Sequence, residues 1–243
     1  MLPTLPRALA LTGLAAGEKY PWSGGPRREI DWALSLGARA VQLDATVAGL
    51  RARELDGAAR RDLVAVLRRG GAEVAGLDLF VPPRHLTDPA HVDRAVSAIV
   101  QGLELAADLG RIGGGARPAV STLLPADLGE DVVSKLGLAA EHQGVVLADH
   151  GWPRRARRGG LVAGVDPAVV YVGGGDALMG MVEAPGAARL SDVGSIGRCE
   201  AGKGRLDIGA YEATLYTCGY RGFLAVDLRG LARQESVARA LLG

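Results

Sequence analysis

The chain has few of the residues that mark disulfide-stabilised, nucleic-acid-binding or membrane-spanning proteins. Its 243 residues include two cysteines and 4% aromatic residues, and 28 Lys and Arg nearly balance 27 Asp and Glu. Two thiols do not make a disulfide framework. A net charge near zero gives no field toward nucleic acid or anionic lipid, and scarce aromatics leave little surface for base stacking. We therefore expect a cytoplasmic protein with no nucleic-acid and no membrane partner.

Long apolar runs are also missing. None approaches the roughly 20 residues that a transmembrane helix needs. The stretch ALALTGLAA at residues 8–16 has the length of a signal-peptide core, but Pro3 and Pro6 interrupt its lead-in and basic residues are scarce there. We expect these residues to form the first strand instead.

What the chain does contain is an aspartate at or just after the end of six apolar runs. These acids are Asp44, Asp78, Asp149, Asp166, Asp192 and Asp227. One acid after a buried strand is ordinary. The recurrence suggests parallel strands whose carboxyl ends meet at one rim, and we expect the functional site at that rim.

Short runs of small and β-branched apolar residues alternate with stretches of helical periodicity, which is typical of repeated βαβ units. The predicted strands are Arg7–Thr12, Ala38–Leu43, Glu73–Leu79, Pro118–Leu123, Val145–Asp149, Leu161–Asp166, Ala187–Asp192 and Phe223–Leu228. The predicted helices are Arg28–Leu36, Gly57–Arg69, Pro89–Leu109, Glu130–His142, Ile208–Cys218 and Gln234–Leu242, with short helices after the fifth and sixth strands.

Eight units of about 30 residues predict one closed (β/α)₈ TIM barrel spanning residues 1–243. The 48% hydrophobic content is enough for a single large core. A doubly wound open sheet is the alternative. It is disfavoured because no dinucleotide-binding fingerprint follows the first predicted strand.

The residues toward the carboxyl end resemble a known family. Asp192 ends the seventh strand, Gly202 and Gly204 with Asp207 follow, and the turn 219–222 (GYRG) leads to Asp227. This arrangement resembles the end of sugar phosphate isomerase/epimerase proteins, which share the xylose isomerase-like TIM barrel. The segments 36–43 and 164–167 resemble the same family.

The resemblance implies a divalent cation held at the strand exits by glutamate, aspartate, histidine and glutamate, which polarises a sugar carbonyl. The matching positions here are Asp149, Asp166, Arg189 and Asp227. A guanidinium has no lone pair to donate, and aspartate reaches one methylene less than glutamate. The chain therefore resembles a divergent member with altered metal ligands. Asp149, His150, Asp166 and Asp227 are the expected ligands of one Mn²⁺ or Mg²⁺, and Asp192 is the expected catalytic base.

Two functions remain open from the sequence. The first is metal-dependent aldose–ketose isomerisation or epimerisation of a sugar or sugar phosphate. The second is a catalytically degenerate barrel that binds a polyol or sugar acid without metal or turnover. In that case Arg189, Arg198 and Arg229 would pair with the rim aspartates in place of the metal.

Other residues are candidates for contact with a carbohydrate ligand. Trp152 follows the fifth strand and is expected to stack on a sugar face, and His85 follows the third strand and is expected to point into the mouth. The arginines at 154, 155, 157 and 158 form either a solvated face or an anion clamp. Self-association as a homodimer is expected, because small homodimers are common among barrel proteins.

Overall fold

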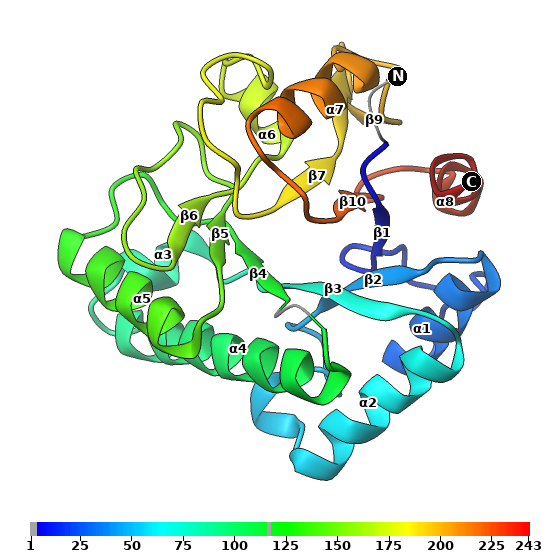
Figure 1. The fold of residues 1–243 in the computed structure, drawn as a ribbon, viewed down its shortest axis with the longest axis horizontal. Coiled ribbons are helices and arrows are strands. Elements are labelled where there is room, and N and C mark those ends of the chain that lie inside the picture. Colours follow the sequence, from blue (N-terminus) through cyan, green and yellow to red (C-terminus); the bar gives the residue numbers. More distant parts are fainter. Residues whose placement is uncertain (1–3, 116–117) are drawn as a thin grey trace.

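The computed structural model describes residues 4–115 and 118–243, and its centre is a ring of eight parallel strands (Figure 1). The strands are β1 (Arg7–Ala10), β2 (Ala40–Asp44), β3 (Glu73–Asp78), β4 (Ala119–Thr122), β5 (Leu147–Asp149), β6 (Leu161–Ala163), β7 (Ala188–Leu190) and β10 (Leu224–Val226). They pair in the order β6-β5-β4-β3-β2-β1-β10-β7. A parallel bridge between Val165 and Ala188 joins the two edges and closes the ring. The predicted (β/α)₈ barrel is confirmed.

Helices cover the outside of this ring. The longer ones are α1 (Pro26–Ser35), α2 (Gly57–Arg69), α4 (Val92–Gly113), α5 (Glu130–Gln143), α7 (Ile208–Thr217) and α8 (Gln234–Leu242). The short ones are α3 (Pro83–Thr87), α6 (Pro167–Val172) and the 3₁₀ turn η1 (Ala52–Glu54), and a hairpin of β8 (Asp192–Gly194) and β9 (Gly197–Cys199) follows β7. No helix among the described residues has the length and apolar character to cross a membrane.

The predicted short helix after the fifth strand is wrong. Residues 150–160 connect β5 to β6 without a helix. This connection lies directly on α5: the Gly160 amide donates to the Gly137 carbonyl at 3.0 Å, and a Cβ on Gly137 would lie 2.2 Å from the Arg158 carbonyl oxygen. Backbone in contact with backbone leaves no room for helical side chains. Sequence periodicity also missed α3, which precedes α4.

The inside of the barrel is polar. Gln42 on β2 donates to Ser121 on β4 at 3.0 Å, and Arg189 on β7 donates to Asp78 on β3 at 2.9 Å. Neither pair sits on neighbouring strands, so both contacts cross the interior. Barrel interiors are usually filled by bulky branched residues. Here the inward positions are largely small residues, among them Ala8, Ala10, Gly76, Ala148 and Ala225.

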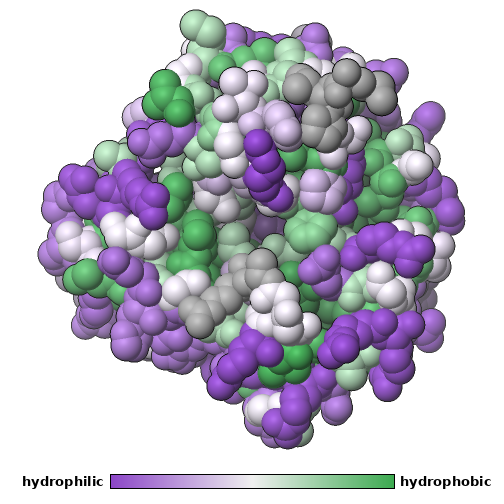
Figure 2. All heavy atoms as spheres, in the orientation of Figure 1, coloured by the Kyte–Doolittle hydropathy of each residue, from purple (hydrophilic) through white to green (hydrophobic). Residues whose placement is uncertain are grey.

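The apolar core consequently lies between the strands and the helices. Outward-facing Val41 and Leu43 of β2 alternate with inward-facing Gln42 and belong to this core, as does Leu103 of α4. Small inward residues leave space inside the ring. Figure 2, seen from the same side as Figure 1, shows a hollow near the middle of the ring.

We predict that Leu103→Ala lowers the free energy of unfolding by about 2–5 kcal/mol, because the fully buried side chain leaves a cavity between α4 and the sheet. Urea denaturation measures the change. Leu138→Ala is the control, since Leu138 of α5 is exposed and its truncation should cost much less. Equal losses in the two variants would contradict this assignment of the core.

Candidate functional site

Three aspartates and three arginines meet at the carboxyl ends of the strands. Asp78 ends β3, Asp166 begins α6 after β6, and Asp227 follows β10. The arginines come from β7, from β9 and from the turn after β10; with the acids they form what we call the rim cluster: Asp78, Asp166, Arg189, Arg198, Asp227 and Arg229. Parallel strands bring these distant residues to one end of the barrel, as the sequence predicted.

Asp166 is at the centre of the rim cluster, and its side chain is 0% exposed. Its Oδ2 accepts from Arg189 at 3.1 Å, Arg198 at 3.1 Å and Arg229 at 3.3 Å. Its Oδ1 accepts from the Ser191 hydroxyl at 2.5 Å and from the first backbone amides of α6. Both oxygens of this carboxylate are therefore fully engaged.

The other two acids are held in the same way. Asp227 Oδ2 lies 2.9 Å from Arg198 Nη1 and 2.5 Å from Arg229 Nη2. Asp78 Oδ2 accepts from Arg189 Nη2 at 2.9 Å. Three negative and three positive charges thus neutralise one another inside the mouth. Paired charges of this kind are tolerated in a buried place, whereas a lone charge is costly.

The pKa shifts of Asp166, Asp227 and Arg229 favour the charged forms of these three groups. Burial raises the pKa of Asp166, but the charges of Arg189 and Arg198 outweigh it and hold the pKa below its usual range. The pKa of Asp227 is also lowered, since the Arg229 hydrogen bond and charge outweigh burial. Burial lowers the pKa of Arg229, but the hydrogen bond and the charge of Asp227 outweigh burial, so the pKa is raised overall. These groups keep their charges at neutral pH.

The expected metal ligands do not fit a divalent cation. Asp149 Oδ1 accepts from the amides of Leu124 and Gly151 at 3.0 and 2.9 Å, and its Oδ2 faces Arg155 Nε at 3.3 Å. Asp166 and Asp227 have guanidinium groups where a cation would sit. The three arginines already neutralise the carboxylates, so no net negative charge is left to attract a divalent cation. Within residues 4–115 and 118–243, no group of three or more His, Cys, Asp and Glu side chains is placed to hold a metal ion.

His150 points into the barrel but does not meet the acids as a ligand would. Its Nε2 lies 3.0 Å from the Ser121 hydroxyl, and its Nδ1 is buried with no hydrogen-bond partner among the described residues. Burial, and after it the charge of Arg189, places the pKa of His150 well below its usual value. Both effects favour the neutral imidazole.

Asp192, the expected catalytic base, has its lone pairs occupied by backbone. Its carboxylate accepts from the amides of Val193, Gly202, Gly204, Arg205 and Leu206 at 2.7–3.0 Å. Hydrogen bonds of this kind favour the ionised carboxylate and leave no oxygen directed at a substrate. The role of base stays a prediction that this geometry does not support. The carboxylate instead fixes the loop that follows β9.

The expected ligand-contacting residues outside the rim cluster have protein partners. His85 lies on α3 and stacks on His91 with ring centroids 5.1 Å apart. Trp152 packs on the glycines after α6, where a Cβ on Gly173 would lie 2.4 Å from the indole, and the Arg154 guanidinium lies over its ring. Arg154 and Arg155 donate to backbone carbonyls. Contacts of His85 and Trp152 with a sugar remain predictions.

Sequence reasoning missed Glu29 of α1. Burial, with a smaller contribution from the charge of Asp44, raises the pKa of Glu29 to about 7. Its Oε2 is buried without a hydrogen-bond partner among the described residues. Nothing in the sequence distinguishes this glutamate from the solvated ones, because a helical repeat does not reveal which carboxylate is buried beside another.

Comparison with known proteins supports the fold. No protein-family model matches the chain, and no curated protein matches its sequence. Solved structures match over nearly the whole length at low identity. A xylose isomerase domain protein from Planctomyces limnophilus is 16% identical, with a TM-score of 0.69, covering 98% of this chain and 94% of that one.

Two further structures are similar. A sugar phosphate isomerase/epimerase from Parabacteroides distasonis is 12% identical with a TM-score of 0.62, covering 98% of this chain and 93% of that one. A xylose isomerase-like TIM barrel protein from Mycobacterium smegmatis, determined in complex with magnesium, is 13% identical with a TM-score of 0.57, covering 98% and 97%. The chain therefore has a xylose isomerase-like TIM barrel fold, as its sequence resemblance predicted.

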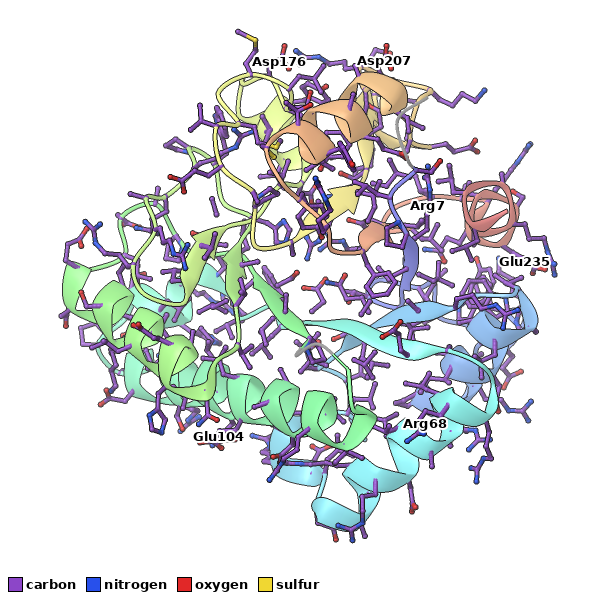
Figure 3. The ribbon with its side chains drawn as sticks, viewed as in Figure 1. Arg7, Arg68, Glu104, Asp176, Asp207 and Glu235 are labelled. Carbon is purple, nitrogen blue, oxygen red and sulfur yellow. The ribbon has the colours of Figure 1, made fainter. Side chains whose placement is uncertain are left out.

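We predict that Asp192→Asn lowers the free energy of unfolding by roughly 2 kcal/mol, because charge-assisted hydrogen bonds to the loop are lost. Hydrogen exchange should become faster at the amides of Gly204, Arg205 and Leu206. Asp207→Asn is the control: Asp207 caps α7 at the edge of the molecule (Figure 3), and asparagine caps a helix almost equally well. Unchanged exchange in the Asp192 variant would refute this role.

We also predict a pH effect at Glu29. Its folded-state pKa of about 7 exceeds the usual 4.5, so the stability contributed by the protonated form is fully present below pH 4.5 and is lost as the pH rises to about 7. Glu29→Gln should remove this loss, so that the variant gains stability relative to wild type between these pH values. Urea denaturation across the range measures it. Glu104→Gln, on the outer side of α4 (Figure 3), is the control, and pH profiles that run parallel for wild type and Glu29→Gln would contradict the prediction.

Proposed function

We propose that this protein binds a sugar acid at the carboxyl end of its barrel, without a divalent cation and without turnover. The observation that supports it is the convergence of three guanidinium groups on Asp166. They lie at the centre of the mouth, where each is paired with carboxylates of the rim cluster. Guanidinium groups bind carboxylates in planar, often bidentate geometry.

Two of the three arginines are accessible to a ligand. The side chains of Arg198 and Arg229 are 27% and 26% exposed, whereas that of Arg189 is 6% exposed. Arg198 uses Nη1 and Nη2 for Asp227 and Asp166, and its Nε has no acceptor among the described residues. A ligand carboxylate at this position would gain a charged donor without breaking the cluster.

The surface beside Arg198 favours an anion over a neutral sugar. A depression of about 490 Å³ lies there, and its charged lining residues are Arg198, Lys203, Arg233 and Glu200. Three positive charges and one negative charge leave a net positive site. The rim cluster itself is neutral, so the depression supplies the positive charge that an acidic ligand requires.

One similar structure is named a sugar phosphate isomerase/epimerase, and another was determined in complex with magnesium. Metal-dependent isomerisation or epimerisation is therefore the alternative function. Structural similarity at 12–16% sequence identity supports the fold but does not identify the reaction. In this chain the guanidinium groups would have to leave Asp166 and Asp227 before a cation could bind. We therefore favour the metal-free site.

The proposal is tested by thermal shift with D-gluconate in the presence of EDTA. At about 100 times its Kd, gluconate should stabilise the fold by about 2.7 kcal/mol. Stabilisation by gluconate should be smaller in Arg198→Met than in wild type, whereas any stabilisation by the neutral polyol sorbitol should be the same in both. Mn²⁺ or Mg²⁺ should neither stabilise the protein nor change the effect of gluconate. Stabilisation by the metal ions together with turnover of an aldose phosphate would establish the isomerase instead.

Arg198→Met should weaken gluconate binding by about tenfold, measured by isothermal titration, since one charge-assisted contact is lost. Arg68→Met is the matched control, because Arg68 lies on α2 at the far edge of the molecule (Figure 3). Equal affinity of wild type and the Arg198 variant would place the carboxylate elsewhere.

A further inference from the structure

A second cavity lies at the opposite end of the barrel from the rim cluster. It has a volume of about 250 Å³ and is lined by the first residues of several strands and the segment before β10. Small residues make up much of its wall: Gly76, Ala119, Gly186, Ala187, Gly222 and Ala225. The polar, small-residue interior described above creates this space.

A buried polar atom at the cavity wall has no hydrogen-bond partner in the part of the chain that the structure describes. Gln42 lines the cavity and is 4% exposed. Its Nε2 donates to Ser121 Oγ at 3.0 Å, whereas its Oε1 is buried without a hydrogen bond from the described residues. A buried acceptor that lacks a donor is destabilising unless something supplies one. The cavity therefore presents a carbonyl oxygen that requires a hydrogen-bond donor.

The charges around the cavity exclude a strongly ionic occupant. Its charged lining residues are one acid and one base, Glu73 and Arg221. The Arg221 guanidinium is already engaged, because it donates to the carbonyls of Tyr216 and Tyr220 and stacks on the Tyr216 ring. The Tyr220 hydroxyl donates to the Phe223 carbonyl. The lining thus carries one acid and one base, and among the described residues Gln42 Oε1 is a buried acceptor without a partner.

We infer that this amino-end cavity is a binding site for a small neutral polyol, one hydroxyl of which donates to Gln42 Oε1. Hydroxyl groups supply the missing donor without bringing charge into the barrel. Binding here is independent of the anion site at the other end. The two ends are nevertheless joined by hydrogen bonds, since Ser121 contacts both Gln42 and His150.

The side-chain amide of Gln42 provides a direct measurement. Erythritol is titrated into ¹⁵N-labelled protein, and the side-chain NH₂ signal of Gln42 is followed. We expect a saturable chemical-shift change with a midpoint of about 1 mM, while the chemical shift of the Gln234 side-chain amide is unchanged. Gln234 is a suitable internal control because it is bound to the carbonyls of Gly13 and Leu228, near the carboxyl end of the barrel.

Two variants separate the site from a general solvent effect. Ala187→Leu fills the cavity and should abolish the Gln42 shift. Gln42→Leu removes the acceptor, and the backbone amide of Gly76, which pairs with Gln42 in the sheet, should then no longer respond to erythritol. Arg68→Met, on α2 and outside both proposed sites, should leave the Gln42 titration unchanged.

Three results would overturn the inference. One is a linear shift that Gln42 and Gln234 share, which indicates bulk solvent. Another is an equal response to acetate, which indicates a site for anions. The third is a crystal structure of erythritol-soaked protein with ordered water only at Gln42 Oε1. None of these bears on the gluconate experiment, so failure here leaves the proposed function standing.

Discussion

Asp166 is a carboxylate with no exposure to solvent, and the architecture of the mouth depends on how its charge is compensated. Three guanidinium groups from β7, β9 and the turn after β10 converge on one of its oxygens. Removing any of them would leave buried charge underpaired, which is far more costly than the net value of the ion pair. The same contacts tie the β8–β9 hairpin and the turn after β10 to the barrel.

This arrangement requires an unusual barrel interior. A long side chain such as Arg189 crosses from β7 to Asp78 on β3 only because the inward positions near it are small. Small residues give up apolar burial inside the ring, and the layer between strands and helices supplies it instead. The outer core therefore provides the apolar burial that the interior of the ring lacks. Ile99 and Leu103 of α4 are among its fully buried side chains.

Sequence patterns predicted the strands well and the connections less well. Each observed barrel strand falls within its predicted range, except that β2 extends one residue further to Asp44. A run of apolar β-branched residues bounded by turn residues is a local sequence signal, and the strands form where this signal occurs. The segment 150–160 does not form the predicted helix because it lies against the backbone of α5. Sequence periodicity is a local property and does not detect a contact between two separate segments.

The sequence alone determined that six aspartates follow apolar runs and that Arg189 stands where the family resemblance implies a metal-binding histidine. These facts are local, because the residue type and the end of an apolar run are both given directly by the sequence. Only the tertiary structure decided which acids share a charge cluster: Asp78, Asp166 and Asp227 meet three arginines, whereas Asp192 is bound by the backbone of its own loop. Only it revealed the unpaired Gln42 oxygen and the elevated pKa of Glu29. Electrostatic pairing and burial depend on distances in space, and residues 29 and 111 positions apart acquire those distances only when the barrel closes.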